Sequence, residues 1–372
     1  MAKPKLRIGL IGTGFMGKAH VFGFASAPRV FELPLKIELR TLADVNADAA
    51  AQAARRLGFA HSTAHWRDII ADPEIDLVDI TAPNALHKEM ALAAIAAGKH
   101  VYCEKPLAPL ARDALEMTEA AEAKGIKTQV GFNYLCNPML GLARDMILAG
   151  ELGEIRGYRG LHAEDYMADA KGAFTFRHDP AGGGALADIG SHALATAEYL
   201  CGPITRVMGD CVTMIKQRPD GKGGSQAVEV DDLGRAFLRF ENGATGSIEG
   251  NWIATGRKMQ HDFEIYGTRG ALAFSQEHFN VLHFFSTDDA KGRQGFRRIE
   301  AGPDHAPYGL FCVAAGHQLG FNDLKAIEVA GFVQAIAGKS QENFNFRKGL
   351  RIQTLVETIQ ASSRDQCWKS VT

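Results

Sequence analysis

The feature that most constrains the fold is the glycine-rich segment GTGFMG at residues 12–17. It follows the apolar run 6–11 and precedes the helix-like segment 18–27. Strand, glycine turn and helix in this order are typical of a dinucleotide-binding unit. The glycines allow a tight turn and a close approach of backbone N–H groups to the pyrophosphate, to which the helix N-terminus adds partial positive charge. The alternative is a glycine turn without a ligand. The candidate cofactor contacts are Gly12, Thr13, Gly14, Phe15 and Met16.

Asp44 is the candidate partner of the adenosine ribose, because it follows the strand predicted over 36–43. It lies 27 residues beyond Gly17 (44 − 17), a little more than the usual ~20, and we attribute the excess to an insertion at 28–34. A carboxylate at this place repels a 2′-phosphate, so the sequence favours NAD, with NADP still possible. The alternative is an Asp that caps the next helix.

Alternating strands and helices predict a doubly wound parallel sheet, a Rossmann domain, over residues 1–131. Strands are expected at 6–11, 36–43, 76–81, 100–103 and 127–132, and helices at 18–27, 48–57, 66–71, 86–97 and 109–124. After the third strand, Pro83, Asn84 and His87 are further candidate cofactor contacts. Asn84 and His87 are equally suited to capping a helix, and for His87 we expect a structural rather than a catalytic role.

Residues 132–372 are predicted to form an α+β domain on a mostly antiparallel, open sheet. Strands are expected from 155 and at 204–216, 227–240, 244–254, 261–267, 270–274 and 280–285, with helices at 139–149, 185–200, 324–336 and 348–361. An open sheet must cover its second face, and self-association is the simplest way. We therefore expect a homodimer or homotetramer formed through this sheet.

Length and charge limit the possible partners. A chain of 372 residues is long enough for two domains. Its 41 Lys and Arg against 43 Asp and Glu give a net charge of −2, which argues against nucleic-acid and membrane partners and favours a neutral small molecule. Six cysteines without ligand spacing argue against structural zinc and a disulfide framework. The short apolar run after the basic N-terminus breaks at Gly12, so we expect a cytoplasmic protein without a signal peptide.

Two further segments carry chemistry. Glu104-Lys105-Pro106 follows the fourth strand and places Lys105 at the carboxyl edge of the sheet, where ligands bind in such folds. A surface lysine in a loop is the alternative. In GGGALADIGSH, at 182–192, three glycines allow close approach to a ligand, and the helix that follows places Asp188 and His192 on one face. A carboxylate and an imidazole paired in this way are suited to moving a proton, although a solvated helix face is an equal alternative.

The segments GTGFMG, TAPNALH, YCEKPLA and GGGALADIGSH, in this order, resemble the Gfo/Idh/MocA oxidoreductases, which include glucose-fructose oxidoreductase and inositol dehydrogenase. The resemblance covers essentially the whole chain. It implies that Lys105, Asp188 and His192 are the catalytic set of an NAD-dependent dehydrogenase, with Glu104 and Lys105 also next to the cofactor. His192 is then the expected base for a secondary alcohol, Lys105 the stabiliser of developing alkoxide charge, and Asp188 the group that positions substrate.

The expected substrate is a neutral sugar, anhydrosugar or cyclitol. Many relatives carry an Asn-Arg-Arg-Phe segment where this chain has Asn133-Tyr134-Leu135, which argues against an anionic substrate. The segment 162–169 with Arg177 and His317 resembles members that act on inositols and on anhydrosugars such as levoglucosan. Candidate substrate contacts are Lys105, Asn133, Tyr134, His162, Glu164, Tyr166, Arg177, Asp188, His192 and His317. Their spacing does not support a metal site.

Two other functions remain open from the sequence. A sugar-modifying enzyme that cleaves glycosides or epimerises sugars could hold NAD tightly and reduce it only transiently. A non-catalytic NAD-binding sensor is the third possibility, and the joint presence of Lys105, Asp188 and His192 argues against it.

Overall fold

The computed structural model describes residues 3–340 and 344–371. The chain forms two compact units, and neither is a single stretch of sequence. Unit 1 comprises Met1–Cys136 and Gly320–Arg351, and unit 2 comprises Asn137–Leu319 and Ile352–Thr372. The sequence-based division at 131/132 places residues 320–351 in the second domain, whereas in the structure they belong to unit 1.

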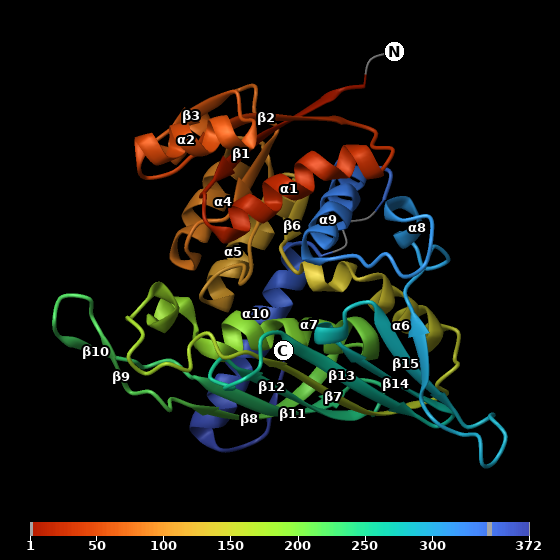
Figure 1. Cartoon of the computed structure of the whole chain (residues 1–372). Helices are drawn as coiled ribbons and strands as arrows, with labels where there is room; N and C mark the ends of the chain where they lie inside the picture. Colours follow the sequence, from red (N-terminus) through yellow and green to blue (C-terminus); the bar gives the residue numbers. More distant parts are fainter. Residues whose placement is uncertain (1–2, 341–343, 372) are drawn as a thin grey trace. The chain divides into compact units, whose positions relative to one another are not determined.

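Unit 1 is built on the predicted parallel sheet, which is confirmed (Figure 1). Six strands lie in the order β3-β2-β1-β4-β5-β6, and every neighbouring pair is parallel. Their bounds are β1 Lys5–Ile11, β2 Lys36–Ala43, β3 His61–Thr63, β4 Leu77–Ile80, β5 His100–Cys103 and β6 Thr128–Val130. Sequence reasoning missed β3, whose three residues are too few to show an alternating pattern.

The helices between the strands of this sheet follow the predicted order, and α3 has its predicted bounds while the ends of the others are shifted. They are α1 Phe15–Val30, α2 Ala47–Leu57, α3 Trp66–Ala71, α4 His87–Ala96 and α5 Ala111–Ala123, with short 3₁₀ turns at Asn84–Leu86 and Asn133–Cys136. The segment 28–34 is not simply an inserted loop, because α1 continues through Pro28 to Val30. A longer first helix therefore accounts for part of the wide spacing between Gly17 and Asp44.

Helix α9 (Phe321–Ile336) belongs to unit 1 because its apolar side completes the core of the Rossmann sheet. Val329, Phe332 and Val333 are buried against a cluster that includes Leu6 and Phe24. A Cβ atom at Gly23 would lie 2.9 Å from the carbonyl oxygen of Lys325, so α1 and α9 approach closely at that point. The return of α9 covers apolar surface that the first 131 residues leave exposed.

Unit 2 contains the predicted open, mostly antiparallel sheet, which is also confirmed. Its nine strands lie in the order β16-β15-β14-β13-β7-β12-β11-β8-β17, and only the pair β7 and β12 is parallel among the described strands. The bounds are β7 Ile155–Ala163, β8 Ile204–Val212, β11 Leu233–Phe240, β12 Thr245–Asn251, β13 Gln260–Gly267, β14 Gly270–Ser275, β15 Val281–Ser286, β16 Arg297–Glu300 and β17 Lys369–Ser370. A separate hairpin joins β9 (Gln217–Pro219) and β10 (Ser225–Ala227).

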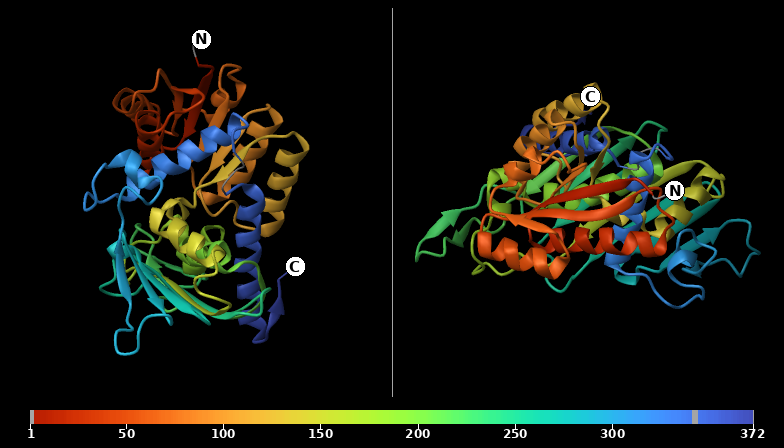
Figure 2. Two further views of the ribbon diagram at one scale, coloured as in Figure 1. Left: turned by 90° about the vertical axis from the view of Figure 1, so that its right-hand side faces the viewer. Right: turned by 90° about the horizontal axis from the view of Figure 1, so that it is seen from above.

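Helices of unit 2 lie on one face of this sheet (Figure 2). They are α6 Pro138–Leu148 and α7 Ser191–Cys201, with the short α8 Tyr308–Phe311 elsewhere in the unit. Tyr158 and His162 on β7 are buried on the α7 side, and Arg159 between them is exposed. Helix α10 (Phe346–Asp365) contributes residues to both units, and its Ser362 and Ser363 hydroxyls accept hydrogen bonds from backbone N–H groups of β8.

The described residues contain no helix that is both long and apolar enough to cross a membrane.

Candidate active site

The glycine turn of unit 1 has the geometry that a pyrophosphate requires. Gly12 has a φ of 101°, and a Cβ atom there would lie 2.8 Å from the carbonyl oxygen of Thr81. A Cβ atom at Gly17 would lie 2.3 Å from the carbonyl oxygen of Gly12, so the turn and the first turn of α1 are in contact. A Cβ atom at Gly14, the N-cap of α1, would meet nothing within 4 Å. Gly12 and Gly17 thus serve the fold, while Gly14 leaves space over the helix N-terminus.

Asp44 lies at the carboxyl end of β2 and is tied to the glycine turn. Its Oδ2 accepts a hydrogen bond from the backbone N–H of Thr13 at 3.1 Å and another from the Thr13 hydroxyl. Asn46, not Asp44, caps α2 by accepting from the Ala49 N–H. The capping alternative for Asp44 is therefore wrong, and its carboxylate lies beside the turn where a ribose hydroxyl would bind.

Pro83, Asn84 and His87 form the 3₁₀ turn and helix start after β4. The imidazole of His87 is fully buried, with ring nitrogens 3.0 Å from the Pro106 carbonyl oxygen and 2.9 Å from that of Ala82. Burial lowers the pKa of His87 below its ordinary value, although both carbonyls oppose this change. His87 thus joins the turn after β4 to the turn after β5.

Glu104 and Lys105 follow β5 at the carboxyl edge of the sheet. The Lys105–Pro106 peptide bond is cis. The side chain of Glu104 is buried, and its Oε2 accepts the Lys105 backbone N–H at 3.1 Å. Burial alone would raise the pKa of Glu104, but Lys325 and His20 beside it hold that pKa well below its usual range. Glu104 is therefore an ionised, internal group of unit 1.

Tyr134 belongs to an aromatic group near the glycine turn. Its ring centroid lies 6.0 Å from that of Phe321, which stacks on Phe15 at 5.7 Å. Phe15 is 72% exposed, which is unusual for a phenylalanine. Asn133, the residue before Tyr134, is buried instead. These rings give unit 1 an accessible aromatic surface beside its cofactor turn.

Asp188 of unit 2 is held by two other predicted residues. Its Oδ2 accepts a hydrogen bond from the Tyr166 hydroxyl at 2.8 Å and one from Nε of Arg177 at 3.0 Å. Burial, together with the Asp188 carboxylate, raises the pKa of Tyr166 well above its ordinary value, so the phenol stays a neutral donor. The three side chains form one polar group of a carboxylate, a phenol and a guanidinium.

The glycine-rich segment before Asp188 contacts the chain itself. A Cβ atom at Gly182, Gly183 or Gly184 would lie 2.2 to 2.6 Å from other atoms of unit 2. The close approach that these glycines allow is thus at least to Arg177, Ala187, Asp231 and their neighbours in the chain itself, and the expected approach to a ligand stays a prediction. The residues 186–190 form a π-helical turn that leads into α7, so Asp188 and His192 are not spaced on a regular α-helix.

His192 lies in a group of three histidines from α7, β7 and β13. The ring centroids of His162 and His261 lie 5.0 Å apart in a stacked arrangement, and His192 lies 5.5 Å from His162 and 6.1 Å from His261. His162 Nε2 is 2.8 Å from Oε1 of Glu164. Burial, aided by His162, lowers the pKa of His261 well below its ordinary value. A neutral imidazole therefore lies next to the candidate base.

His317 is exposed. Its backbone carbonyl oxygen accepts a hydrogen bond from the Tyr308 hydroxyl at 2.6 Å. In the part of the chain that the structure describes, no group of three or more His, Cys, Asp or Glu side chains is arranged to hold a metal ion.

Sequence reasoning missed Phe321, His261 and Lys325. His261 stands in the strand segment QHDFEIYG, where alternation predicts that it shares the buried face with Phe263 and Ile265, and a buried histidine is a usable signal. Phe321 and Lys325 lie between about 190 and 310 residues beyond the segments of unit 1 that they contact. No local pattern links such distant positions.

Two family models match the chain. An oxidoreductase family model with an NAD-binding Rossmann fold matches residues 6–132, and a GFO/IDH/MocA C-terminal domain model matches residues 141–273.

The chain is similar along almost its whole length to a sugar dehydrogenase. It is 38% identical to levoglucosan dehydrogenase of Pseudarthrobacter phenanthrenivorans over 387 aligned positions that cover 98% of each protein. A solved structure of levoglucosan dehydrogenase in complex with NADH and levoglucosan has a TM-score of 0.95 and 39% identity and covers 99% of both chains. The 1,5-anhydro-D-fructose reductase of Ensifer adhaerens is 31% identical over 72% of this chain and 74% of that protein.

Proposed function

The chain belongs to the Gfo/Idh/MocA family of NAD-binding oxidoreductases, and on that premise we propose that it oxidises a secondary hydroxyl of a neutral anhydrosugar, sugar or cyclitol to a ketone with NAD. The observation that carries the proposal is the similarity to levoglucosan dehydrogenase across 98% of both proteins. The resemblance inferred from the motifs is thereby confirmed at the level of the family. An anhydrosugar such as levoglucosan is the first substrate to test.

We propose that residues 1–131 hold the cofactor and that residues 132–372 supply most substrate contacts. The glycine turn fits a pyrophosphate, because Gly14 leaves space over the N-terminus of a 16-residue helix. Asp44 would bind the ribose hydroxyls and disfavour a 2′-phosphate. When bound, the nicotinamide of NAD accepts the hydride from the substrate carbon. Equal catalytic efficiency with NAD and NADP would refute the role given to Asp44.

The proposed catalytic residues handle the proton and the charge of the reacting hydroxyl. The ammonium group of Lys105 would stabilise negative charge developing on the oxygen, and His192 would remove the proton. Asp188, fixed by Tyr166 and Arg177, would accept hydrogen bonds from substrate hydroxyls and orient the ring. His162 and His261 lie beside His192, with Glu164 bonded to the first and Thr196 to the second, and these groups would influence the charge of His192.

His192 can act as the base only while its imidazole is neutral. The direct test is NADH formation, followed by absorbance with levoglucosan, inositols and aldoses, each with NAD and with NADP. Product formation without net NADH would favour transient cofactor reduction instead. A Lys105→Ala variant with the activity of the wild type would contradict the mechanism.

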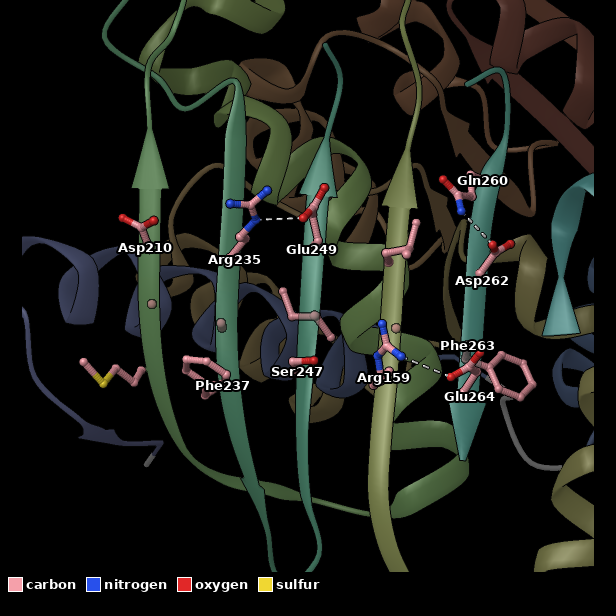
Figure 3. A pocket seen from close by; sticks show the side chains of 16 residues that line it. Arg159, Asp210, Arg235, Phe237, Ser247, Glu249, Gln260, Asp262, Phe263 and Glu264 are labelled. Carbon is pink, nitrogen blue, oxygen red and sulfur yellow. Dashed lines mark hydrogen bonds and ion pairs between the residues drawn. The ribbon is translucent and has the colours of Figure 1, made fainter. Parts of the chain in front are cut away.

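We also propose that two copies of the chain associate through the open face of the unit 2 sheet. This face bears a shallow hollow of about 540 Å³ (Figure 3). It presents ion pairs between neighbouring strands, Arg159 with Glu264 and Arg235 with Glu249, around Phe237, which is 62% exposed. Exposed aromatic surface with polar groups around it is typical of interfaces.

Light scattering tests this association. A Phe237→Glu variant should lower the molar mass of the particle, whereas Phe22→Glu, which changes an exposed phenylalanine on α1, should leave it unchanged. A wild-type protein that is monomeric at micromolar concentration would refute the proposal.

A cytoplasmic location is proposed on the basis of the thiols. The six cysteines lack the spacing of a disulfide framework or a metal site, which suits a reducing compartment.

A further inference from the structure

A cluster of charged side chains is buried inside unit 1, where the proposed reaction does not use it. It consists of His20, Asp79, Tyr102, Glu104, Lys325 and Glu328, which we call the buried charge cluster. The side chains of Lys325 and His20 are 0% exposed. The members come from α1, β4, β5, the residue after β5, and α9, so the cluster connects the Rossmann strands to the helix that returns late in the chain.

Lys325 is the central cation of this cluster. Its Nζ donates hydrogen bonds to Oε1 of Glu104 at 2.9 Å, to Oε2 of Glu328 at 3.0 Å and to the Tyr102 hydroxyl at 3.1 Å. His20 lies between Asp79 and Glu104, with a ring nitrogen 2.8 Å from each carboxylate. A buried carboxylate stays ionised only when cations and donors compensate it, and Lys325 and His20 supply this compensation to Glu104.

Glu104 divides its two carboxylate oxygens between the cluster and the turn after β5. Oε1 faces His20 and Lys325, while Oε2 accepts the backbone N–H of Lys105. A Cβ atom at Gly131 would lie 2.2 Å from Oε1, so the absence of a side chain there gives the carboxylate its place. Gly131 thus limits the position of the Glu104 carboxylate on one side, and on the other side this carboxylate accepts the backbone N–H of Lys105.

We propose that Lys325 is a positioning residue for Lys105, acting through the ionised Glu104. Without the lysine, the remaining groups of the cluster carry an excess of negative charge, and Glu104 takes up a proton or moves. A protonated or displaced carboxyl accepts the Lys105 N–H less well. The turn then loses the bond that fixes its direction, and the ammonium group of Lys105 is held less firmly. This inference rests on the proposed catalytic role of Lys105.

Four variants test the role of Lys325. Lys325→Met removes the cation. The double variant Lys325→Met with Glu104→Gln removes the charge pair but keeps an amide oxygen that accepts the Lys105 N–H. The double variant Lys325→Met with Glu104→Leu removes the pair and the acceptor. Lys99→Met is the matched control, because Lys99 is also buried in unit 1 and donates to the carbonyl oxygens of Asp72 and Ile75 near the opposite end of β5.

The first readout is hydrogen exchange at the Lys105 amide, which does not depend on activity. We expect exchange to become about 10-fold faster or more in Lys325→Met and in the Leu double variant, and to remain near the wild-type rate in the Gln double variant and in Lys99→Met. The second readout is kcat for the sugar. It should fall roughly 10- to 100-fold in Lys325→Met and in the Leu double variant, with little change in the NADH dissociation constant.

Wild-type exchange at Lys105 in a folded Lys325→Met variant would overturn the proposal. If that variant does not fold, the two double variants are compared. Equal exchange rates of the Lys105 amide in the Gln and Leu double variants would also overturn the proposal. A wild-type protein without turnover on any sugar would refute the proposed function, while the exchange measurement would still test the link between Lys325 and Lys105.

Discussion

The buried carboxyl of Asp231 leads to a prediction about how stability depends on pH. Asp231 lies beside the glycine-rich segment that leads to Asp188, and its Oδ2 accepts the backbone N–H of Leu186 at 2.8 Å. Burial raises the pKa of Asp231 to about 6 from an ordinary value of 3.8, with the neighbouring charge of Asp232 adding to the effect and the Leu186 N–H opposing it. The group therefore binds its proton more tightly in the folded protein than in the unfolded chain.

The sign of the effect follows from this difference. A carboxyl with a raised pKa contributes stability at pH values below 3.8, and this contribution is lost as the pH rises through about 6. At about 1.36 kcal/mol for each unit of pKa, the shift corresponds to about 3 kcal/mol. Asp231→Asn keeps the shape and an acceptor oxygen but does not titrate. Relative to that of the wild type, the free energy of unfolding of the variant should therefore increase by about 2 to 3 kcal/mol as the pH rises from 4 to 7.5.

The assay is urea unfolding followed by tryptophan fluorescence at several pH values. Only the difference between variant and wild type is interpreted, because other carboxylates, such as Asp72 and Glu122, have lowered pKa values and act in the opposite direction. Asp304→Asn, at an exposed position of unit 2 outside the proposed association face, controls for the loss of one negative charge. A difference for Asp231→Asn that stays constant across this pH range would refute the reasoning.

Three further predictions concern the candidate site. Gly12→Ala should prevent stable folding of the turn, because its Cβ would meet Thr81 at a φ of 101°, whereas Gly14→Ala should fold normally and weaken NADH binding in a fluorescence titration; normal NADH affinity in Gly14→Ala would contradict the fit of the turn. Asp44→Ser should raise the ratio of NADP to NAD catalytic efficiency by about 10-fold or more, measured with one sugar, and an unchanged ratio would argue against a ribose contact. Tyr166→Phe removes one donor to Asp188 and should lower kcat/KM for the sugar by roughly 10-fold, about 1.5 kcal/mol, without changing the NADH dissociation constant; a change confined to NADH binding would show that Tyr166 acts elsewhere.

Local signals were sufficient for the cofactor half of the fold. The turn at Gly12, the strand before it and the positions of Asp44 and Lys105 at strand ends all depend on neighbours within a few residues. The same reasoning failed where distant segments meet. No pattern near Phe321 or Lys325 shows that α9 returns to the first sheet, because the apolar side of α9 would suit any core.

The site in unit 2 shows the same limit at a smaller scale. Tyr166, Arg177 and Asp188 were each named as candidate contacts from their chemistry, yet their mutual hydrogen bonds depend on the loop between β7 and α7. The glycines at 182–184 predict a close approach, but which group approaches depends on what lies opposite, and opposite Gly184 lies Asp231. The residue types predict the chemistry of the site, whereas the contacts between these residues depend on how the loop folds.

Three candidate carboxylates, Asp44 and Glu104 of unit 1 and Asp188 of unit 2, share one kind of arrangement, which is present before any ligand binds. Asp44 is bonded to Thr13, Asp188 to Tyr166 and Arg177, and Glu104 to Lys325 and His20. In each case donors from the chain itself fix the carboxylate. Groups held in this way do not have to reorganise when charge develops on a substrate, and this is the condition under which electrostatic stabilisation is most effective. A buried ion pair adds little net stability compared with apolar side chains of similar volume, so the contribution we assign to Lys325 is the fixed direction of Glu104 rather than the strength of the fold.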